Sequence, residues 1–257
     1  MNTLIEILKA IIIGIIQGIT EVLPISSSAH NAVIHYIFFN SSITLTNEIF
    51  LHISSTLACI FFLRKDILSL IKQLLNKDFL YFIKLIIGTL PAFIIYLIFD
   101  DYIKSVFDSL FLIGIFLLFT SFILLISSTF FNKSLSNDIT FKGSFYIGLC
   151  QSLALIPGIS RSGITLFGGL CNKINLKDTV KFSSFLYLIS SIGSCILDYD
   201  NLLNITLTKE LIISFIVTFI CTYLTFIFLY NKLRKKHFIF FSIYTFILGI
   251  ILIINNL

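Results

Sequence analysis

Long apolar runs are the feature that most constrains how this chain of 257 residues folds. Four runs, at 79–99, 109–131, 211–230 and 238–257, have about the 20 apolar residues that a helix needs to cross a bilayer. Charged residues make up 12% of the chain and hydrophobic residues 57%. That is too little charge to cover a water-soluble domain of this length. The sequence predicts an all-α integral membrane protein with one membrane domain, residues 1–257.

The remaining apolar runs are shorter or interrupted. Residues 49–63 and 182–197 are predicted as further spans. Residues 10–39 and 145–170 are each broken by a polar stretch containing proline and serine. Irregular backbone at membrane depth is tolerated only inside protein or beside a water-filled cavity. Each broken segment is therefore predicted to be a re-entrant helical hairpin.

The two broken segments resemble each other. GIIQGITEVLPISSS at 14–28 aligns with GLCQSLALIPGISRS at 148–162. Five identities recur 134 positions apart: Gly14 and Gly148, Gln17 and Gln151, Ile25 and Ile159, Ser26 and Ser160, Ser28 and Ser162. Each hairpin precedes three spans, which gives two repeats of about 1–133 and 134–257. Because three is odd, the second repeat enters from the opposite face, and the fold is predicted to be an inverted repeat.

Loop charges indicate the orientation. Thirteen basic residues lie on the face reached after the first and third spans: Arg64, Lys65, Lys72, Lys77, Lys133, Lys142, Lys173, Lys177, Lys181, Lys232, Arg234, Lys235 and Lys236. Three, at Lys9, Lys104 and Lys209, lie on the other face. Positive charge marks the inner side of a membrane. Both termini and the mouth of the first hairpin are predicted to face outward. The net charge of +5 is assigned to anionic lipid and not to nucleic acid.

The first hairpin carries a polar cluster. Gln17 and Glu21 lie four residues apart and share one helix face. Three hydroxyls and an imidazole follow the break, at Ser26, Ser27, Ser28 and His30. A helix that restarts there presents unpaired N–H groups and a positive dipole end to an anion. A buried Glu21 is costly at membrane depth, so a functional role is expected.

The second hairpin supplies the complementary charge. Arg161 offers a planar fork of donors that suits phosphate oxygens. Around it lie further candidate contacts, at Ser160, Ser162, Gly163 and Thr165. Together the hairpins hold a carboxylate, an imidazole, hydroxyls and an arginine, which suits binding and cleavage of a phosphate ester. His52 lies outside both breaks and is not assigned to this site.

The strings QGITEVLPISSSAH and LIPGISRSG resemble the two signature motifs of the undecaprenyl-diphosphate phosphatase family, the bacitracin-resistance proteins. The similarity covers nearly the whole chain. It implies hydrolysis of undecaprenyl diphosphate to the monophosphate in the bacterial plasma membrane, which recycles the lipid carrier for cell-wall synthesis. Gln17 departs from the glutamate of well-known members, which puts in doubt a metal site built from two carboxylates of this hairpin.

The cluster and the resemblance together lead to a mechanistic hypothesis. Ser27 is the expected nucleophile, with Glu21 or His30 taking its proton and Arg161 neutralising charge. Attack by an activated water is the alternative. Mg²⁺ or Ca²⁺ is expected to bridge Glu21 and the diphosphate. The expected substrate contacts are Gln17, Ser26, Ser28, Ser160, Ser162, Gly163 and Thr165.

Two other classes of protein compete with this hypothesis. Inverted repeats with broken helices are a common transporter plan, so a transporter or flippase of phosphate or polyprenyl phosphate is the alternative. A structural subunit would leave Glu21 and Arg161 unexplained. Phosphate release in detergent, where there are no two sides to transport between, separates these classes. The expected partners are the polyprenyl diphosphate and the lipid bilayer, and a homodimer is left open.

Overall fold

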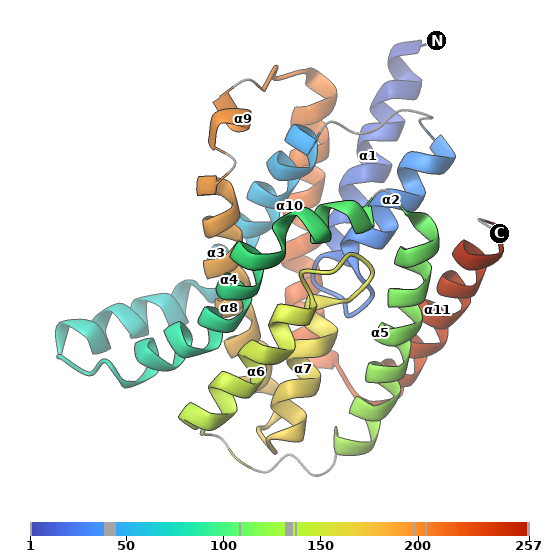
Figure 1. Ribbon diagram of the computed structural model, residues 1–257. Helices are drawn as coiled ribbons and strands as arrows, with labels where there is room; N and C mark the ends of the chain where they lie inside the picture. Colours follow the sequence, from blue (N-terminus) through green and yellow to red (C-terminus); the bar gives the residue numbers. More distant parts are fainter. Residues whose placement is uncertain are drawn as a thin grey trace.

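The computed structural model describes residues 2–38, 45–107, 109–131, 136, 138–197, 199–203 and 205–255. The helices are α1 (Asn2–Thr20), α2 (Ser27–Phe38), α3 (Leu45–Leu75), α4 (Leu80–Phe107), α5 (Leu110–Phe130), α6 (Phe141–Leu153), α7 (Arg161–Cys171), α8 (Leu176–Leu197), α9 (Tyr199–Leu203), α10 (Lys209–Lys232) and α11 (Lys235–Ile254). Figure 1 shows them arranged around two turns near the centre of the molecule.

Five helices of the described chain are long and apolar enough to cross a membrane: α4 over Leu80–Phe99, α5, α8, α10 and α11. They confirm the runs predicted at 79–99, 109–131, 182–197, 211–230 and 238–257, although residues 256 and 257 lie outside the described residues. The span predicted at 49–63 forms the first part of α3. Charged Arg64 and Lys65 follow it within the same helix, and α3 falls outside this group of five.

Both broken segments form a helix, a turn and a second helix. The first turn separates α1 from α2, and the second separates α6 from α7. Left-handed backbone occurs in each, at Ser26 (φ 69°) and at Gly158 (φ 95°). A helix cannot continue through this conformation, so the chain reverses there. The predicted hairpin at 10–39 is longer than expected, because α1 already begins at Asn2, and residue 39 lies outside the described part.

Each hairpin packs against a long helix of the other half of the chain. α1 lies along α10, and α6 lies along α4. Glycines permit the close approach: a Cβ at Gly14 would lie 2.7 Å from the Ser214 carbonyl oxygen. A Cβ at Gly148 would lie 2.4 Å from the Gly88 carbonyl oxygen. Small residues at helix contacts are the usual means of packing in membranes.

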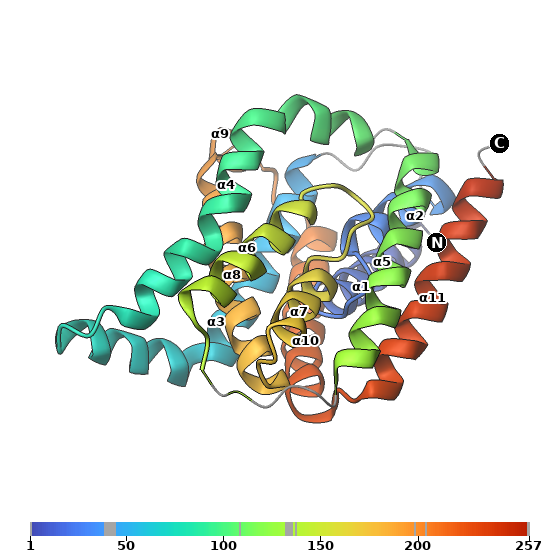
Figure 2. The same ribbon diagram turned by 60° about the horizontal axis from the view of Figure 1, so that its bottom comes forward.

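The last helix of each half also packs against its counterpart. α5 lies along α11, and Gly114 and Gly249 meet where they cross. Figures 1 and 2 show α5 and α11 side by side and running in opposite directions. In Figure 1, α1 and α5 descend while α6 and α11 rise, and α2 rises while α7 descends. Both hairpin turns lie near the centre of the molecule (Figure 1).

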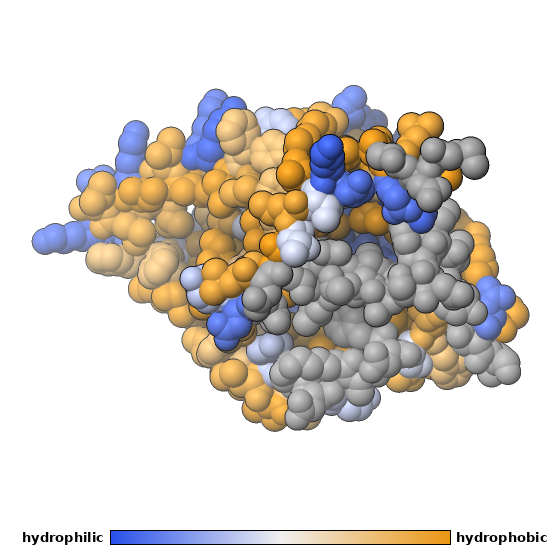
Figure 3. Space-filling view, turned by 90° about the horizontal axis from the view of Figure 1, so that it is seen from above, coloured by the Kyte–Doolittle hydropathy of each residue, from blue (hydrophilic) through white to orange (hydrophobic). Residues whose placement is uncertain are grey.

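The outer surface of the bundle is apolar. Large hydrophobic side chains such as Leu97, Ile216 and Phe246 are exposed on α4, α10 and α11. In Figure 3, the arm at the left, where α3 ends and α4 begins, is largely hydrophobic, with a hydrophilic tip. A water-soluble protein rarely exposes contiguous apolar surface of this extent. The chain is a multi-pass membrane protein.

The glycine contact between α4 and α6 predicts that two glycine-to-alanine substitutions differ in their effect on the free energy of unfolding. Gly148→Ala should lower the free energy of unfolding by about 1–3 kcal/mol, because its methyl group has no space beside Gly88. Gly193→Ala is the matched control: nothing lies within 4 Å of its Cβ, and helix propensity favours alanine. Denaturation in detergent measures both, and equal effects would contradict this packing.

Candidate active site

The turns of the two hairpins touch at the centre of the bundle. Ser162 Oγ donates to the Leu23 carbonyl oxygen at 3.0 Å, and the Gly158 N–H lies 3.4 Å from Ser28 Oγ. A cavity of about 200 Å³ lies between the turns. That volume suits a small headgroup but not a long hydrocarbon chain, which must lie outside it.

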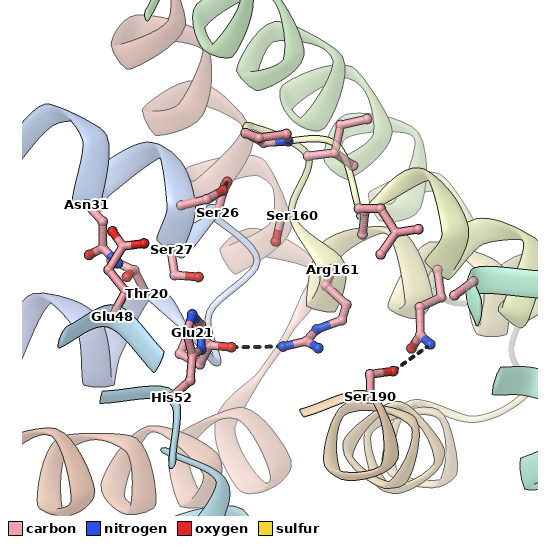
Figure 4. A pocket seen from close by; sticks show the side chains of 17 residues that line it. Thr20, Glu21, Ser26, Ser27, Asn31, Glu48, His52, Ser160, Arg161 and Ser190 are labelled. Carbon is pink, nitrogen blue, oxygen red and sulfur yellow. Dashed lines mark hydrogen bonds and ion pairs between the residues drawn. The ribbon is translucent and has the colours of Figure 1, made fainter. Parts of the chain in front are cut away.

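An ion pair joins the hairpins inside this cavity. Arg161 Nη2 donates to Glu21 Oε1 at 2.8 Å, and the Glu21 side chain is 2% exposed. Figure 4 shows the two side chains pointing toward each other. The Arg161 guanidinium also lies over the Tyr187 ring, 4.2 Å from its centroid. A buried charge is tolerated only when it is paired, so each hairpin holds the other's charged group.

The other carboxylate oxygen of Glu21 is held from two further helices. Gln17 Nε2 donates to Glu21 Oε2 at 3.0 Å, and His52 Nδ1 lies 3.5 Å from the same atom. Gln17 Oε1 accepts from Asn31 Nδ2 at 2.8 Å. Gln17 is fully buried, and both ends of its amide are used. Its polar atoms therefore orient Glu21 and join α1 to α2.

The serines mark where two helices begin. Ser27 is the first residue of α2 and lines the cavity. Ser160 caps α7, with its Oγ accepting from the Gly163 N–H at 3.2 Å. The same hydroxyl contact recurs in both hairpins, between Ser26 and Ser28 at 3.1 Å and between Ser160 and Ser162 at 3.3 Å. Both helix N-termini confirm the predicted restarts and provide dipoles that favour an anion.

His30 lies behind the first turn. Its Nδ1 is 2.7 Å from the Ser26 carbonyl oxygen, and its Nε2 is 2.7 Å from the Tyr244 hydroxyl. Both ring nitrogens are therefore engaged, and the ring supports the left-handed backbone at Ser26. A role for His30 in proton transfer stays a prediction.

Six of the predicted site residues line the cavity: Glu21, Ser26, Ser27, Ser28, Ser160 and Arg161. The other five lie around it: Gln17, His30, Ser162, Gly163 and Thr165. Thr165 is fully buried; its Oγ1 donates to the Arg161 carbonyl oxygen at 2.8 Å and contacts Ser183 Oγ at 2.6 Å. In the described structure, these five polar groups are bound to protein atoms. Substrate contacts from them stay a prediction.

Sequence reasoning missed residues that other helices bring to the cavity. Glu48 and His52 come from α3, and Gln151 and Ser190 come from α6 and α8. Two signals existed in the sequence. Glu48 and His52 are four apart and share a helix face. Gln151 is the repeat counterpart of Gln17.

The donor set fits a divalent cation only in part. Among the described residues, no three His, Cys, Asp or Glu side chains form a group able to hold a metal ion. Glu21 and Glu48 both line the cavity. One or two carboxylates together with substrate phosphates suffice for Mg²⁺. The residues therefore suit a cation that arrives with a phosphate ligand.

The fold and the site define a class of protein: a multi-pass membrane protein with a buried polar cavity and an ion pair between two helical hairpins. The bacitracin resistance protein BacA family matches residues 10–251. The chain belongs to this family. Among similar proteins, the undecaprenyl-diphosphatase of Acholeplasma laidlawii is 37% identical over 98% of this chain and 98% of that protein. Undecaprenyl-diphosphatase 1 of Shouchella clausii is 35% identical, over 97% and 96% of the two chains.

A double-mutant cycle tests the buried ion pair. Glu21→Gln and Arg161→Gln should be coupled by about 1–3 kcal/mol in the free energy of unfolding, because each single change leaves a charge unpaired. The control is the pair Lys181 and Asp66, whose atoms are 2.8 Å apart but whose side chains are about a third exposed. Coupling there should be below about 1 kcal/mol. Equal couplings in detergent would contradict a structural role for the buried pair.

Proposed function

We propose that this chain hydrolyses undecaprenyl diphosphate to undecaprenyl phosphate and inorganic phosphate, and so recycles the lipid carrier used in cell-wall synthesis. One observation supports this most directly. Arg161, Ser27 and two helix N-termini face one cavity between the hairpins. Each of these groups favours phosphate oxygens. The names of the related proteins point to the same reaction.

The proposed chemistry begins at Ser27. Its Oγ attacks the terminal phosphorus, and its proton passes to Glu21 or His30. The bond from that phosphorus to the bridging oxygen breaks, and undecaprenyl phosphate leaves with the oxygen. Water then attacks the phosphoserine, releasing inorganic phosphate and restoring the hydroxyl. Direct attack by water on the diphosphate gives the same products in one step.

Arg161 and the helix N-termini supply electrostatic stabilisation. Charge moves onto the bridging oxygen as the phosphoryl group transfers, and fixed donors lower the barrier to that transfer. Glu21 and Tyr187 hold the guanidinium in place before substrate arrives. A pre-oriented donor costs no reorganisation when the reaction occurs. In this proposal, the ion pair positions the catalytic arginine.

A divalent cation, Mg²⁺ or Ca²⁺, is part of the proposal. Glu21 and Glu48 would hold it together with diphosphate oxygens and water. Such an ion neutralises phosphate charge as the bond breaks. Glu48 replaces the second carboxylate that the first hairpin lacks at Gln17. The proposal fits the way in which Mg²⁺ keeps several waters and few protein ligands.

The proposed topology is an inverted repeat in the bacterial plasma membrane, with the cavity opening to the outer face. Three packing relations support it: α1 on α10 corresponds to α6 on α4, and α5 lies on its own counterpart α11. The thirteen-to-three charge bias supplies the direction. A transporter or flippase is not favoured, because the related proteins carry the name of a hydrolase. Pairing of two copies stays a prediction.

Ser27→Ala tests the nucleophile. If Ser27 forms the covalent intermediate, phosphate release by the purified protein in detergent should fall by more than about 100-fold. Rapid quenching of the unaltered protein should trap phosphate on Ser27. Ser128→Ala, whose hydroxyl bonds only within α5 among the described contacts, is the control. If the Ser27→Ala variant keeps more than about one-hundredth of the activity and no phosphate is trapped on Ser27, direct attack by water is favoured. Full activity of the unaltered protein in EDTA would contradict the requirement for a divalent cation.

Tags on the termini test the topology. A tag at residue 1 or at residue 257 should be labelled in intact cells, because both ends are expected on the side with few basic loops. An inner-face tag placed after Lys173 should be labelled only after the membrane is permeabilised. Labelling of either terminus only after permeabilisation would contradict the proposed orientation.

A further inference from the structure

A buried amide at the cavity has an unused polar atom. Gln151 is 2% exposed, lies in the last turn of α6 and lines the cavity. Its Nε2 donates to Ser190 Oγ at 3.2 Å. Its Oε1 is buried and has no hydrogen-bond partner among the described residues. Such a buried polar atom is unfavourable unless a ligand or water satisfies it.

The aligned glutamine of the first hairpin differs from Gln151 in its hydrogen bonds. Gln17, the counterpart of Gln151, uses both ends of its amide within its own hairpin. It bonds Glu21, four residues later, and Asn31, fourteen residues later. Each end of its amide thus has a partner within the protein.

The residues four and fourteen positions after Gln151 do not hydrogen-bond its amide. Four residues later stands Leu155, which has no polar side-chain atom. Fourteen residues later stands Thr165, whose hydroxyl bonds the Arg161 carbonyl oxygen and Ser183. Gln151 turns instead to Ser190 on α8, which holds only one end of the amide. One end of the Gln151 amide is thus left without a hydrogen bond among the described residues.

The position of this amide indicates which part of a ligand it meets. In Figure 4, Arg161 lies between Glu21 on one side and Ser190 on the other. Ser27, the candidate nucleophile, lies on the same side of Arg161 as Glu21. Gln151 lies on the side of Ser190, to which it is hydrogen-bonded, and the apolar Ala154 and Leu155, which follow it in the chain, also line the cavity. Arg161 therefore separates Gln151 and Ser190 from Glu21 and Ser27.

The amide can present a donor to an anion. Ser190 Oγ both donates and accepts, so the Gln151 amide can turn over and keep this bond with Oε1 as the acceptor. The NH₂ group then occupies the position that lacks a hydrogen-bond partner among the described residues, and it can donate to a phosphate oxygen. We propose that Gln151, held by Ser190, binds the phosphate that stays attached to the prenyl chain, beside apolar residues that meet the first carbons of the chain. This rests on the proposed function and assigns the retained phosphate to the second hairpin.

Product inhibition tests the assignment. Undecaprenyl phosphate carries the retained phosphate, whereas inorganic phosphate resembles the group transferred to Ser27. Gln151→Met keeps the side-chain length but removes both polar atoms. It should raise the inhibition constant for undecaprenyl phosphate by roughly tenfold or more, as for one lost bond to a charged group. The inhibition constant for inorganic phosphate should not change. Ser190→Ala should act in the same direction by a smaller factor.

Two further variants sharpen the test. Gln151→Glu places a negative charge beside the retained phosphate, so it should weaken the binding of undecaprenyl phosphate more than Gln151→Met does. If Gln151→Met does not fold, Gln151→Glu is measured in its place. Ser194→Ala, one turn along α8, removes a hydroxyl that bonds the Ser191 carbonyl oxygen and should leave both constants unchanged.

Each outcome bears on one hypothesis. A lower kcat in Gln151→Met with both inhibition constants unchanged would overturn the assignment and make Gln151 a group that orients water. An equal rise in both constants would also overturn it. If the unaltered protein released no phosphate from undecaprenyl diphosphate, the proposed function itself would fail. If the unaltered protein hydrolyses undecaprenyl diphosphate but substitution of Gln151 changes neither inhibition constant, only the role given to Gln151 would be rejected.

Discussion

The ion pair between Glu21 and Arg161 is the interaction on which the rest of the site depends. It joins two hairpins that are 140 residues apart in sequence. A carboxylate with 2% of its side chain exposed is unfavourable in a bilayer unless charge and hydrogen bonds compensate it. Arg161, Gln17 and His52 provide that compensation from three other helices or turns. Moving any of these elements would leave the carboxylate under-satisfied.

Helix packing makes this ion pair possible. Gly14 and Gly148 let each hairpin lie against a long helix of the opposite half, so the turns meet although their helices run in opposite directions. The turns end in helix N-termini, and the cavity they enclose is lined by hydroxyl, amide and charged groups. A surface that would be costly in lipid is thereby enclosed within protein, and the apolar exterior remains free to face the hydrocarbon.

The two hairpins carry different residues at some aligned positions, and their polar side chains are bonded differently. Matching positions hold Glu21 in one half and Leu155 in the other, and the two glutamines Gln17 and Gln151 consequently differ in use. The Gln17 amide bonds the Glu21 carboxylate at one end and Asn31 at the other. The Gln151 amide, by contrast, has an Oε1 without a hydrogen-bond partner in the part of the chain that the structure describes. The two hairpins enclose the cavity together, whereas unlike residues at aligned positions give them different polar groups.

Five of the six predicted spans, the two hairpins and the polar motifs could be predicted from the sequence alone, because apolar run length and local breaks act over short stretches of chain. It identified Glu21, Ser27 and Arg161, since these stand inside the breaks. Only the tertiary structure decided which polar groups face the cavity. Thr165 and His30 are engaged by protein atoms, whereas Glu48 reaches the cavity from α3. Side-chain direction depends on how helices distant in sequence pack against each other, and local spacing carries no record of that packing.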